Sequence, residues 1–158
     1  MISRSLAILF VLYLFVFAKQ NPDDRFVTYI VDPQKQNIQM FWKDDSDKNF
    51  GSIQNLKSSV EKRNKTLVFA MNGGMYKEDD SPLGLFIEDQ KTKTSLNTST
   101  GNGNFYLQPN GVFYITTGNV PVISATSNFK NNGQIKYATQ SGPMLIVDGV
   151  INSLFKEG

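Results

Sequence analysis

The second half of the chain alternates short β-branched and aromatic segments with groups of turn-forming residues, and this pattern restricts the possible fold most. The turns include Asn110-Gly111, Asn131-Asn132-Gly133 and Asp148-Gly149. Because these residues adopt the backbone angles of tight hairpins, we expect the flanking strands to pair antiparallel. The segments predicted as strands are residues 83–87, 105–108, 111–116, 120–124, 135–140 and 143–147.

The first half is less regular. Residues 25–31 and 37–42 are predicted to form a hairpin, and residues 66–71, nearly all apolar, a strand buried on both faces. Ser52 is a suitable cap for a helix with Ile53, Leu56 and Val60 on one side. The polar segment 92–104 is predicted to be a long loop. The resulting fold class is α+β, with a mixed, largely antiparallel sheet and few helices on one face.

The two ends of the sequence predict a signal peptide and an incomplete domain. Residues 6–18 are apolar, follow Arg4 and end in Val16-Phe17-Ala18, which is the order of a secretory signal peptide, residues 1–18. We therefore expect an exported protein, secreted or periplasmic, with no stable membrane span after cleavage. Residues 19–158 are assigned to one domain. A strand that would return antiparallel to residues 143–147 starts at residues 150–151 but does not continue before Gly158, so we expect an incomplete domain.

Cysteine and histidine are both absent from the 158 residues. This excludes disulfides, thiol nucleophiles, histidine-based catalytic triads and Cys/His zinc sites. The missing disulfides favour a bacterial envelope for an exported chain. The formal net charge is only +2, so no basic face indicates a nucleic-acid partner.

Two glycine-containing turns remain as candidates for chemistry. Asn72-Gly73-Gly74 offers bare amides and a side-chain amide to a sugar or a phosphate, and Ser81-Pro82-Leu83-Gly84 follows closely enough to line the same cleft. Thr139-Gln140-Ser141-Gly142 is a second polar interruption between strands. On spacing alone, an ordinary structural turn is the favoured interpretation, because Asn-Gly is the commonest turn pair.

Four sequence segments, taken in order, resemble the phosphodiester glycosidase family, and most closely its small exported bacterial members. They comprise residues 69–76 (FAMNGGMY), 81–85 (SPLGL), 104–113 around Asn104 (NFYLQPNGVF) and 138–149 (ATQSGPMLIVDG). The family includes the lysosomal uncovering enzyme, which removes N-acetylglucosamine from mannose-6-phosphate diesters. We refer to these four stretches as the motif segments.

The resemblance implies an α+β fold and hydrolysis of a sugar joined through its anomeric carbon to a phosphodiester. It also implies a C-terminal part, with an arginine-containing strand and a Leu-Asp-Gly-type turn, that we do not find in this chain. The substrate-binding residues expected from the motif segments are Asn72, Gly73, Gly74, Ser81, Gly84, Asn104, Gln140, Ser141 and Gly142.

Hydrolysis at an anomeric carbon commonly uses two carboxyl groups. Asp79 and Asp80 lie between the first two motif segments and are the candidate catalytic residues, with solvated loop charges as the alternative. Tyr76 and Tyr106 are candidates for stacking on a sugar, although aromatic residues beside strands are often core residues. No ligand spacing requires a metal, but a divalent cation is compatible with a phosphate-bearing substrate.

Two functional hypotheses follow. The first is an exported glycosidase acting on glycosyl phosphodiesters. The second is a carbohydrate- or envelope-polymer-binding protein of the same fold without catalysis. A third possibility concerns stability: a strand at residues 143–147 with an unpaired edge would leave the chain unable to fold alone.

Overall fold

The computed structural model describes residues 26–155. The chain divides into two units, residues 1–30 and 31–158, and the fold reported below belongs to the second. The predicted signal peptide lies outside the described residues. Residues 26–30 are exposed and form no regular secondary structure, so the described part of the predicted strand 25–31 is not a strand.

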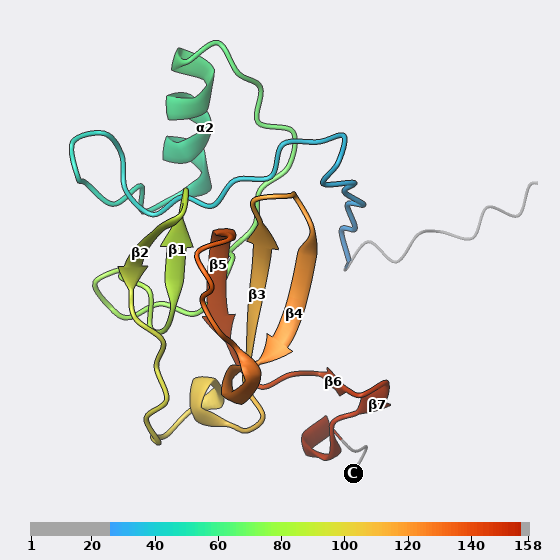
Figure 1. The fold of residues 1–158 in the computed structure, drawn as a ribbon. Helices are drawn as coiled ribbons and strands as arrows, with labels where there is room; N and C mark the ends of the chain where they lie inside the picture. The colour runs from blue at the N-terminus through green and yellow to red at the C-terminus, as the bar shows by residue number, and fades with distance from the viewer. Residues whose placement is uncertain (1–25, 156–158) are drawn as a thin grey trace, which may run out of the picture. The chain divides into compact units, whose positions relative to one another are not determined.

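The main element is a five-stranded sheet in which every neighbouring pair is antiparallel, with the order β2-β1-β5-β3-β4 (Figure 1). The hairpin β1–β2 lies on one side of β5 and the hairpin β3–β4 on the other, so the last of these five strands in sequence occupies the centre of the sheet. The predicted α+β class with a largely antiparallel sheet is confirmed. The strands are β1 Phe86–Glu88, β2 Lys91–Thr94, β3 Gly111–Thr116, β4 Pro121–Ala125 and β5 Ile135–Ser141.

The hydrophobic core lies where β1, β3 and β5 meet. Ile87 and Val112 have no exposed surface, and Ala138 pairs with Ile87 on one side and with Tyr114 on the other. Full burial of each large aliphatic side chain contributes about 1.5–3 kcal/mol to folding. Since residues 137–140 are all buried, β5 is covered on both faces. The core residues are Leu85, Ile87, Val112, Ile135 and Ala138, with Leu96, Tyr114 and Phe129 packed against them.

Helix α2, Ile53–Lys62, forms as predicted. The Ser52 hydroxyl accepts a hydrogen bond from the backbone N–H of Asn55 at 3.1 Å, which satisfies one of the free donors of the first turn. No residue of α2 is buried, and Figure 1 shows the helix beyond the ends of β1 and β2. Among residues 26–155, none of the helices has the length and apolar character needed to cross a membrane.

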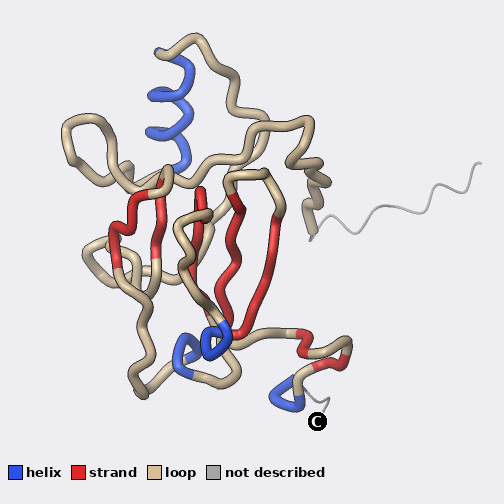
Figure 2. The backbone as a smooth tube through the Cα atoms, in the orientation of Figure 1, coloured by secondary structure: helices blue, strands red, loops and turns tan. Residues whose placement is uncertain are grey.

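Three other predicted strands are absent from the structure. Residues 37–42 and 66–71 form none, and Figure 2 shows loop throughout between α2 and β1. Val68 and Met71 are 71% and 73% exposed, so the expected burial on both faces was wrong. An apolar run shows no periodicity that identifies a strand, and this one has no strand partner among the described residues. Phe105 and Tyr106 instead belong to a 3-10 helix, η1, Asn104–Tyr106, and residues 107–108 form no strand.

The predicted loop 92–104 was too long, because its first residues belong to β2. Alternating lysine and threonine in Lys91–Thr94 suit an edge strand, where charge discourages pairing with other chains, but they lack the apolar signal of a core strand. Asp89 and Gln90 make the preceding turn, with φ angles of 45° and 64°.

The last strands form a separate hairpin. β6, Ile146–Val147, pairs with β7, Val150–Ile151, across the predicted Asp148-Gly149 turn. The predicted strand 143–147 is therefore shortened and lies outside the five-stranded sheet. Asn152 holds the hairpin together, because its N–H donates to Leu145 O and its Nδ2 to Met144 O, both at 2.9 Å.

Glu88 allows a test of the sheet through pH. Burial raises the pKa of Glu88 above its ordinary value, and the Asp89 carboxylate adds to this against the opposing effect of Lys93. A raised folded-state pKa means that the stabilising contribution of protonated Glu88 is complete at low pH and is lost as pH rises through that pKa. Glu88→Gln should therefore be more stable than the wild type at pH 7, with the difference shrinking toward pH 4.

Thermal unfolding between pH 4 and pH 8 measures this difference. Glu88 is only half-buried, so we expect less than about 1 kcal/mol, or a few degrees in Tm. Glu78→Gln, at an exposed turn, is the matched control. A difference between Glu88→Gln and the wild type that does not change with pH would contradict the prediction.

Candidate functional site

The four motif segments meet at one end of the central strand, and their glycines allow the close approach. A Cβ on Gly74 would collide with the Thr139 side chain and lie 3.2 Å from the carbonyl oxygen of Gln140. The N–H of Leu83 donates to Met75 O at 3.0 Å. The first, second and fourth segments are therefore in direct contact.

Two further glycines bring in the third segment. A Cβ on Gly84 would lie 2.5 Å from Gln140 Oε1 and 2.7 Å from the Phe105 ring. A Cβ on Gly142 would lie 2.6 Å from Asn110 Cβ and 2.8 Å from Phe105 O. Since Phe105 is only 2% exposed, it anchors η1 between the second and fourth segments.

The side chain of Gln140 is the polar centre of this arrangement and is 1% exposed. Its Oε1 accepts hydrogen bonds from the N–H groups of Leu85 and Asn97, at 3.0 and 2.9 Å. Its Nε2 donates to Asn97 O at 2.7 Å and to Thr126 Oγ1 at 3.3 Å. Because these groups are used inside the protein, the geometry makes Gln140 a positioning residue for the loop around Asn97.

A cleft of about 360 Å³ opens beside these contacts, and we call it the tyrosine cleft. Tyr76, which is 57% exposed, and the half-buried Tyr106 both line it. Phe105 packs edge-on against Tyr106, with ring centroids 5.1 Å apart, and so fixes that ring. The lining residues come from motif segments and from the loop before η1: Gly74, Met75, Tyr76, Leu83, Asn102, Gly103, Asn104, Phe105 and Tyr106.

Asp79 and Asp80 lie outside the lining of the tyrosine cleft, in an exposed turn. Isolated pairing of Tyr76 with Pro82 closes the turn, and Asp80 adopts a φ of 61° within it. The Ser81 hydroxyl and N–H donate to Asp79 Oδ1, at 2.6 and 3.0 Å. These hydrogen bonds from Ser81 lower the pKa of Asp79 below its ordinary value. Asp79 is therefore a carboxylate at neutral pH and is unsuited to donating a proton.

The predicted binding residues thus occupy different places. Gly74 and Asn104 line the cleft, whereas Gly84, Gln140 and Gly142 form the packing behind it. The other predicted residues lie apart from the lining: Asn72 and Gly73 are exposed, Ser81 holds Asp79, and Ser141 is half-buried at the end of β5. Their contact with a substrate stays a prediction, as does a catalytic role for Asp79 or Asp80.

Several residues of the site were missed by the sequence analysis. Asn102 and Gly103 line the cleft from a loop whose only signal was its polar composition. Asn97 and Asn110 act behind the cleft: Asn97 Nδ2 donates to Leu83 O and Asn110 Nδ2 to Phe105 O, both at 3.1 Å. Asn110 was identified as part of a turn pair and of the third motif segment, but not as a residue of the site. Among residues 26–155, no three acidic side chains gather closely enough to hold a metal ion.

The arrangement is suited to binding a sugar. Two tyrosine rings provide apolar faces with polar edges, and the glycine backbone at Gly74 and Gly103 leaves amide groups accessible to a ligand. No charged side chain is among the nine lining residues, so recognition in the cleft depends on aromatic and neutral polar contacts.

Adjacent glycines in the first motif segment should respond differently to substitution. Gly74→Ala places a methyl group into Thr139, and we expect a loss of about 1–3 kcal/mol in the free energy of unfolding. Gly73→Ala meets no atom within 4 Å and should change stability by less than about 0.5 kcal/mol. Urea unfolding of the two variants measures both effects. Equal stability of the two variants would contradict the packing described for Gly74.

Replacing Gln140 tests the buried network. In Gln140→Met, the N–H groups of Leu85 and Asn97 lose their acceptor, and we expect a loss of about 3 kcal/mol or more in the free energy of unfolding. Thr126→Val removes only the longest of the four hydrogen bonds and should cost about 1 kcal/mol. Denaturant unfolding should show a larger loss of stability in Gln140→Met than in Thr126→Val. A Gln140→Met protein as stable as the wild type would disprove the positioning role of Gln140.

Comparisons with known proteins identify the family of the segment that contains this site. A model of the phosphodiester glycosidase family matches residues 65–158, which include the sheet, the motif segments and the tyrosine cleft. YigE, an uncharacterized protein of Escherichia coli (strain K12), is 39% identical over 124 residues, which are 78% of this chain and 48% of YigE. The chain thus spans about half the length of this curated relative. No solved structure matches the chain significantly. Because the family match covers more than half of the chain and all of the site, the chain belongs to the phosphodiester glycosidase family.

Proposed function

We propose that the protein is an exported glycosidase that hydrolyses the sugar–phosphate linkage of glycosyl phosphodiesters, with N-acetylglucosamine phosphodiesters as model substrates. Family membership supports glycosidase chemistry on a carbohydrate-derived substrate. The observation that carries the proposal is the tyrosine cleft, in which the motif segments place Tyr76, Tyr106 and bare backbone at one opening. The activity is proposed for the whole protein, since this chain spans about half of its curated relative.

The proposed reaction breaks the bond between the anomeric carbon and the phosphate oxygen. Positive charge develops on the sugar ring, while the departing phosphate monoester takes the bonding electrons and carries negative charge. Water adds to the anomeric carbon and gives the free sugar. Because phosphate is already a good leaving group, donors that stabilise its oxygens matter more than a strong general acid. Backbone amides beside Gly74 and Gly103 are candidates for those donors, and Asp79, as a carboxylate, is a candidate for stabilising positive charge or activating water.

Export is supported by the apolar run at residues 6–18 that follows Arg4. A secreted or periplasmic enzyme would meet envelope and extracellular polymers, which contain sugar phosphodiesters. Secretion of a tagged full-length protein, with processing near residue 18 determined by N-terminal sequencing, is the direct measurement.

A second candidate is a carbohydrate- or envelope-polymer-binding protein without catalysis. One observation favours it: none of the nine residues that line the tyrosine cleft is acidic, whereas glycosidases commonly place two carboxyl groups about 5–10 Å apart at the reacting bond. Both candidates predict sugar binding in the cleft. They differ in turnover.

The deciding experiment incubates the purified full-length protein with an N-acetylglucosamine phosphodiester and measures free N-acetylglucosamine. Release from the diester, but not from an N-acetylglucosaminide with an uncharged alkyl leaving group, would support the glycosidase. Saturable binding without release across a panel of glycosyl phosphodiesters would support the binding protein instead.

Tyr76 offers a variant that tests the cleft with little risk to the fold, because its side chain is largely exposed. Tyr76→Ala should weaken binding of the N-acetylglucosamine phosphodiester by about two- to tenfold, since a stacked aromatic ring contributes about 0.5–1.5 kcal/mol. Tyr76→Phe keeps the ring and is the matched control. Titration calorimetry gives the three affinities, and unchanged affinity in Tyr76→Ala would exclude stacking on this ring.

A further inference from the structure

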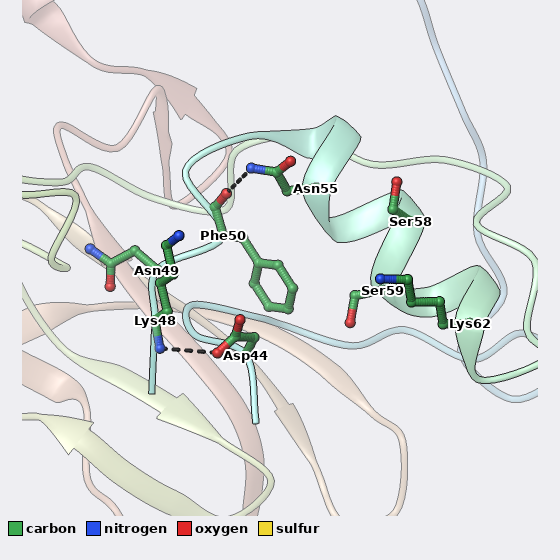
Figure 3. A pocket seen from close by; sticks show the side chains of 8 residues that line it. All are labelled: Asp44, Lys48, Asn49, Phe50, Asn55, Ser58, Ser59 and Lys62. Atoms are coloured by element: carbon green, nitrogen blue, oxygen red, sulfur yellow. Dashed lines mark hydrogen bonds between the residues drawn. The ribbon is translucent and has the colours of Figure 1, made fainter. Parts of the chain in front are cut away.

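A second pocket lies between helix α2 and the loop before it, and it shares no lining residue with the tyrosine cleft. Its volume is about 320 Å³. We call it the lysine pocket, after Lys48 and Lys62, which line it from the loop and from the end of α2 (Figure 3). The pocket lies before residue 65, outside the segment matched by the family.

The helix presents a polar face to this pocket. Asn55, Ser58, Ser59 and Lys62 are spaced three, four and seven residues apart, which places them on one side of α2. Asn55, Ser58 and Lys62 are exposed and Ser59 is half-buried, whereas the apolar Leu56 and Val60 lie on another side of the helix. The donors and acceptors of the polar face are therefore accessible to a polar ligand in the pocket.

The loop wall of the pocket is fixed by hydrogen bonds. Asn55 Nδ2 donates to Phe50 O at 2.7 Å and ties the helix to the loop. Asp44 Oδ1 accepts from the backbone N–H groups of Ser46 and Lys48, at 2.9 and 3.0 Å. The one carboxylate of the lining is therefore committed to shaping the loop.

The pocket carries two ammonium groups that no acidic side chain among the described residues neutralises. The neighbouring Lys43, Lys57 and Arg63 each form an ion pair with an acidic side chain. Lys48 and Lys62 form none within the part of the chain that the structure describes. The lining thus combines two unpaired positive charges with a single negative charge, which favours an anion.

Phe50 supplies an apolar surface inside this charged frame. Figure 3 shows its ring in the middle of the pocket, between Lys48 on one side and Ser59 and Lys62 on the other. Phe41 contacts Phe50 edge-on, with centroids 6.1 Å apart, and so holds the ring in place. A sugar can lay the C–H groups of one face on such a ring. The volume is at the small end of the ~300–1,000 Å³ typical of ligand pockets, which suits a monosaccharide rather than a longer chain.

We infer that the lysine pocket binds a phosphorylated monosaccharide, with the phosphate between Lys48 and Lys62 and the sugar on Phe50. Asn55, Ser58 and Ser59 line the same pocket, and their side-chain oxygens are the candidates for hydrogen bonds to the sugar hydroxyls. This is a second site, distinct from the proposed catalysis. It holds or fails whatever the outcome in the tyrosine cleft.

Titration calorimetry on the full chain tests the inference with glucose 1-phosphate, inorganic phosphate and glucose. Glucose 1-phosphate should bind more tightly than either of the others, and its affinity should fall as salt is raised, because the contact is between charges. Equal affinity for glucose 1-phosphate and inorganic phosphate would overturn the sugar component. Equal affinity for glucose 1-phosphate and glucose would overturn the role of the lysines.

Variants place the binding site. Lys62→Met and Lys48→Met should each weaken glucose 1-phosphate binding by about tenfold, the size expected for losing a charge-assisted hydrogen bond. Lys57→Met removes the same charge from α2 outside the pocket and should leave the affinity unchanged. An equal loss in Lys57→Met would show general surface charge and disprove the site.

Two more variants separate the pocket from the tyrosine cleft. Phe50→Leu should weaken binding of glucose 1-phosphate but not of inorganic phosphate, because only the sugar contacts the ring. Tyr76→Ala should retain full binding of glucose 1-phosphate, whereas loss of binding in this variant would assign the ligand to the tyrosine cleft and overturn the inference. Thermal unfolding of each variant checks that the fold is intact.

Discussion

The candidate site depends on one buried amide. Gln140 lies on the central strand, and its side chain joins the N–H of Leu85, both backbone groups of Asn97 and the hydroxyl of Thr126. These partners are 14 to 55 residues away in sequence. A buried amide is costly unless its hydrogen bonds are made, so this network specifies one arrangement of the three segments. The loop that carries Asn102 and Gly103 to the cleft starts from that arrangement.

Close packing of glycines, together with the hydrogen bonds of Gln140, fixes the arrangement of the motif segments. Gly74, Gly84 and Gly142 each lie against another motif segment at a distance that no side chain permits. Their role in this structure is steric rather than conformational, because none of the three has a positive φ. Motif segments that are separated by tens of residues therefore meet because backbone approaches backbone around β5. This packing sets the positions of the tyrosine rings that line the cleft.

The predictable parts of the fold were those with a local cause. The Ser52 cap and the spacing of Ile53, Leu56 and Val60 indicated α2, while turn residues bounded β3, β4 and β5 to within a residue or so. The prediction of a strand at residues 66–71 was wrong, because apolar composition alone does not show whether a segment has a partner strand. The strand Lys91–Thr94 was missed for the opposite reason: it has a partner strand, β1, but its hydrogen bonds to β1 require no apolar side chain that would mark it in the sequence.

The site shows the same division between local and long-range causes. The motif segments identified Gly74, Asn104 and the tyrosines, but whether a polar residue faces a ligand or the interior depends on contacts across the fold. Gln140 was expected to contact the substrate, yet its partners Asn97 and Thr126 come from segments whose positions no local pattern gives. The pKa of Asp79 is likewise lowered by hydrogen bonds from Ser81, which is two residues away and meets Asp79 through the shape of the turn.

Charge differs between the tyrosine cleft and the lysine pocket. The tyrosine cleft has a neutral lining although the proposed substrate carries a phosphodiester, so stabilisation of that charge within the cleft falls to backbone and side-chain amides. A neutral lining binds the ionised product less tightly than lysine side chains would, and turnover requires that the product leave. The lysine pocket, by contrast, brings unpaired ammonium groups to an aromatic ring, an arrangement that holds an anion rather than releases it. The proposed catalysis in the tyrosine cleft and the proposed retention of a phosphorylated sugar in the lysine pocket are therefore consistent with the charges of the two linings.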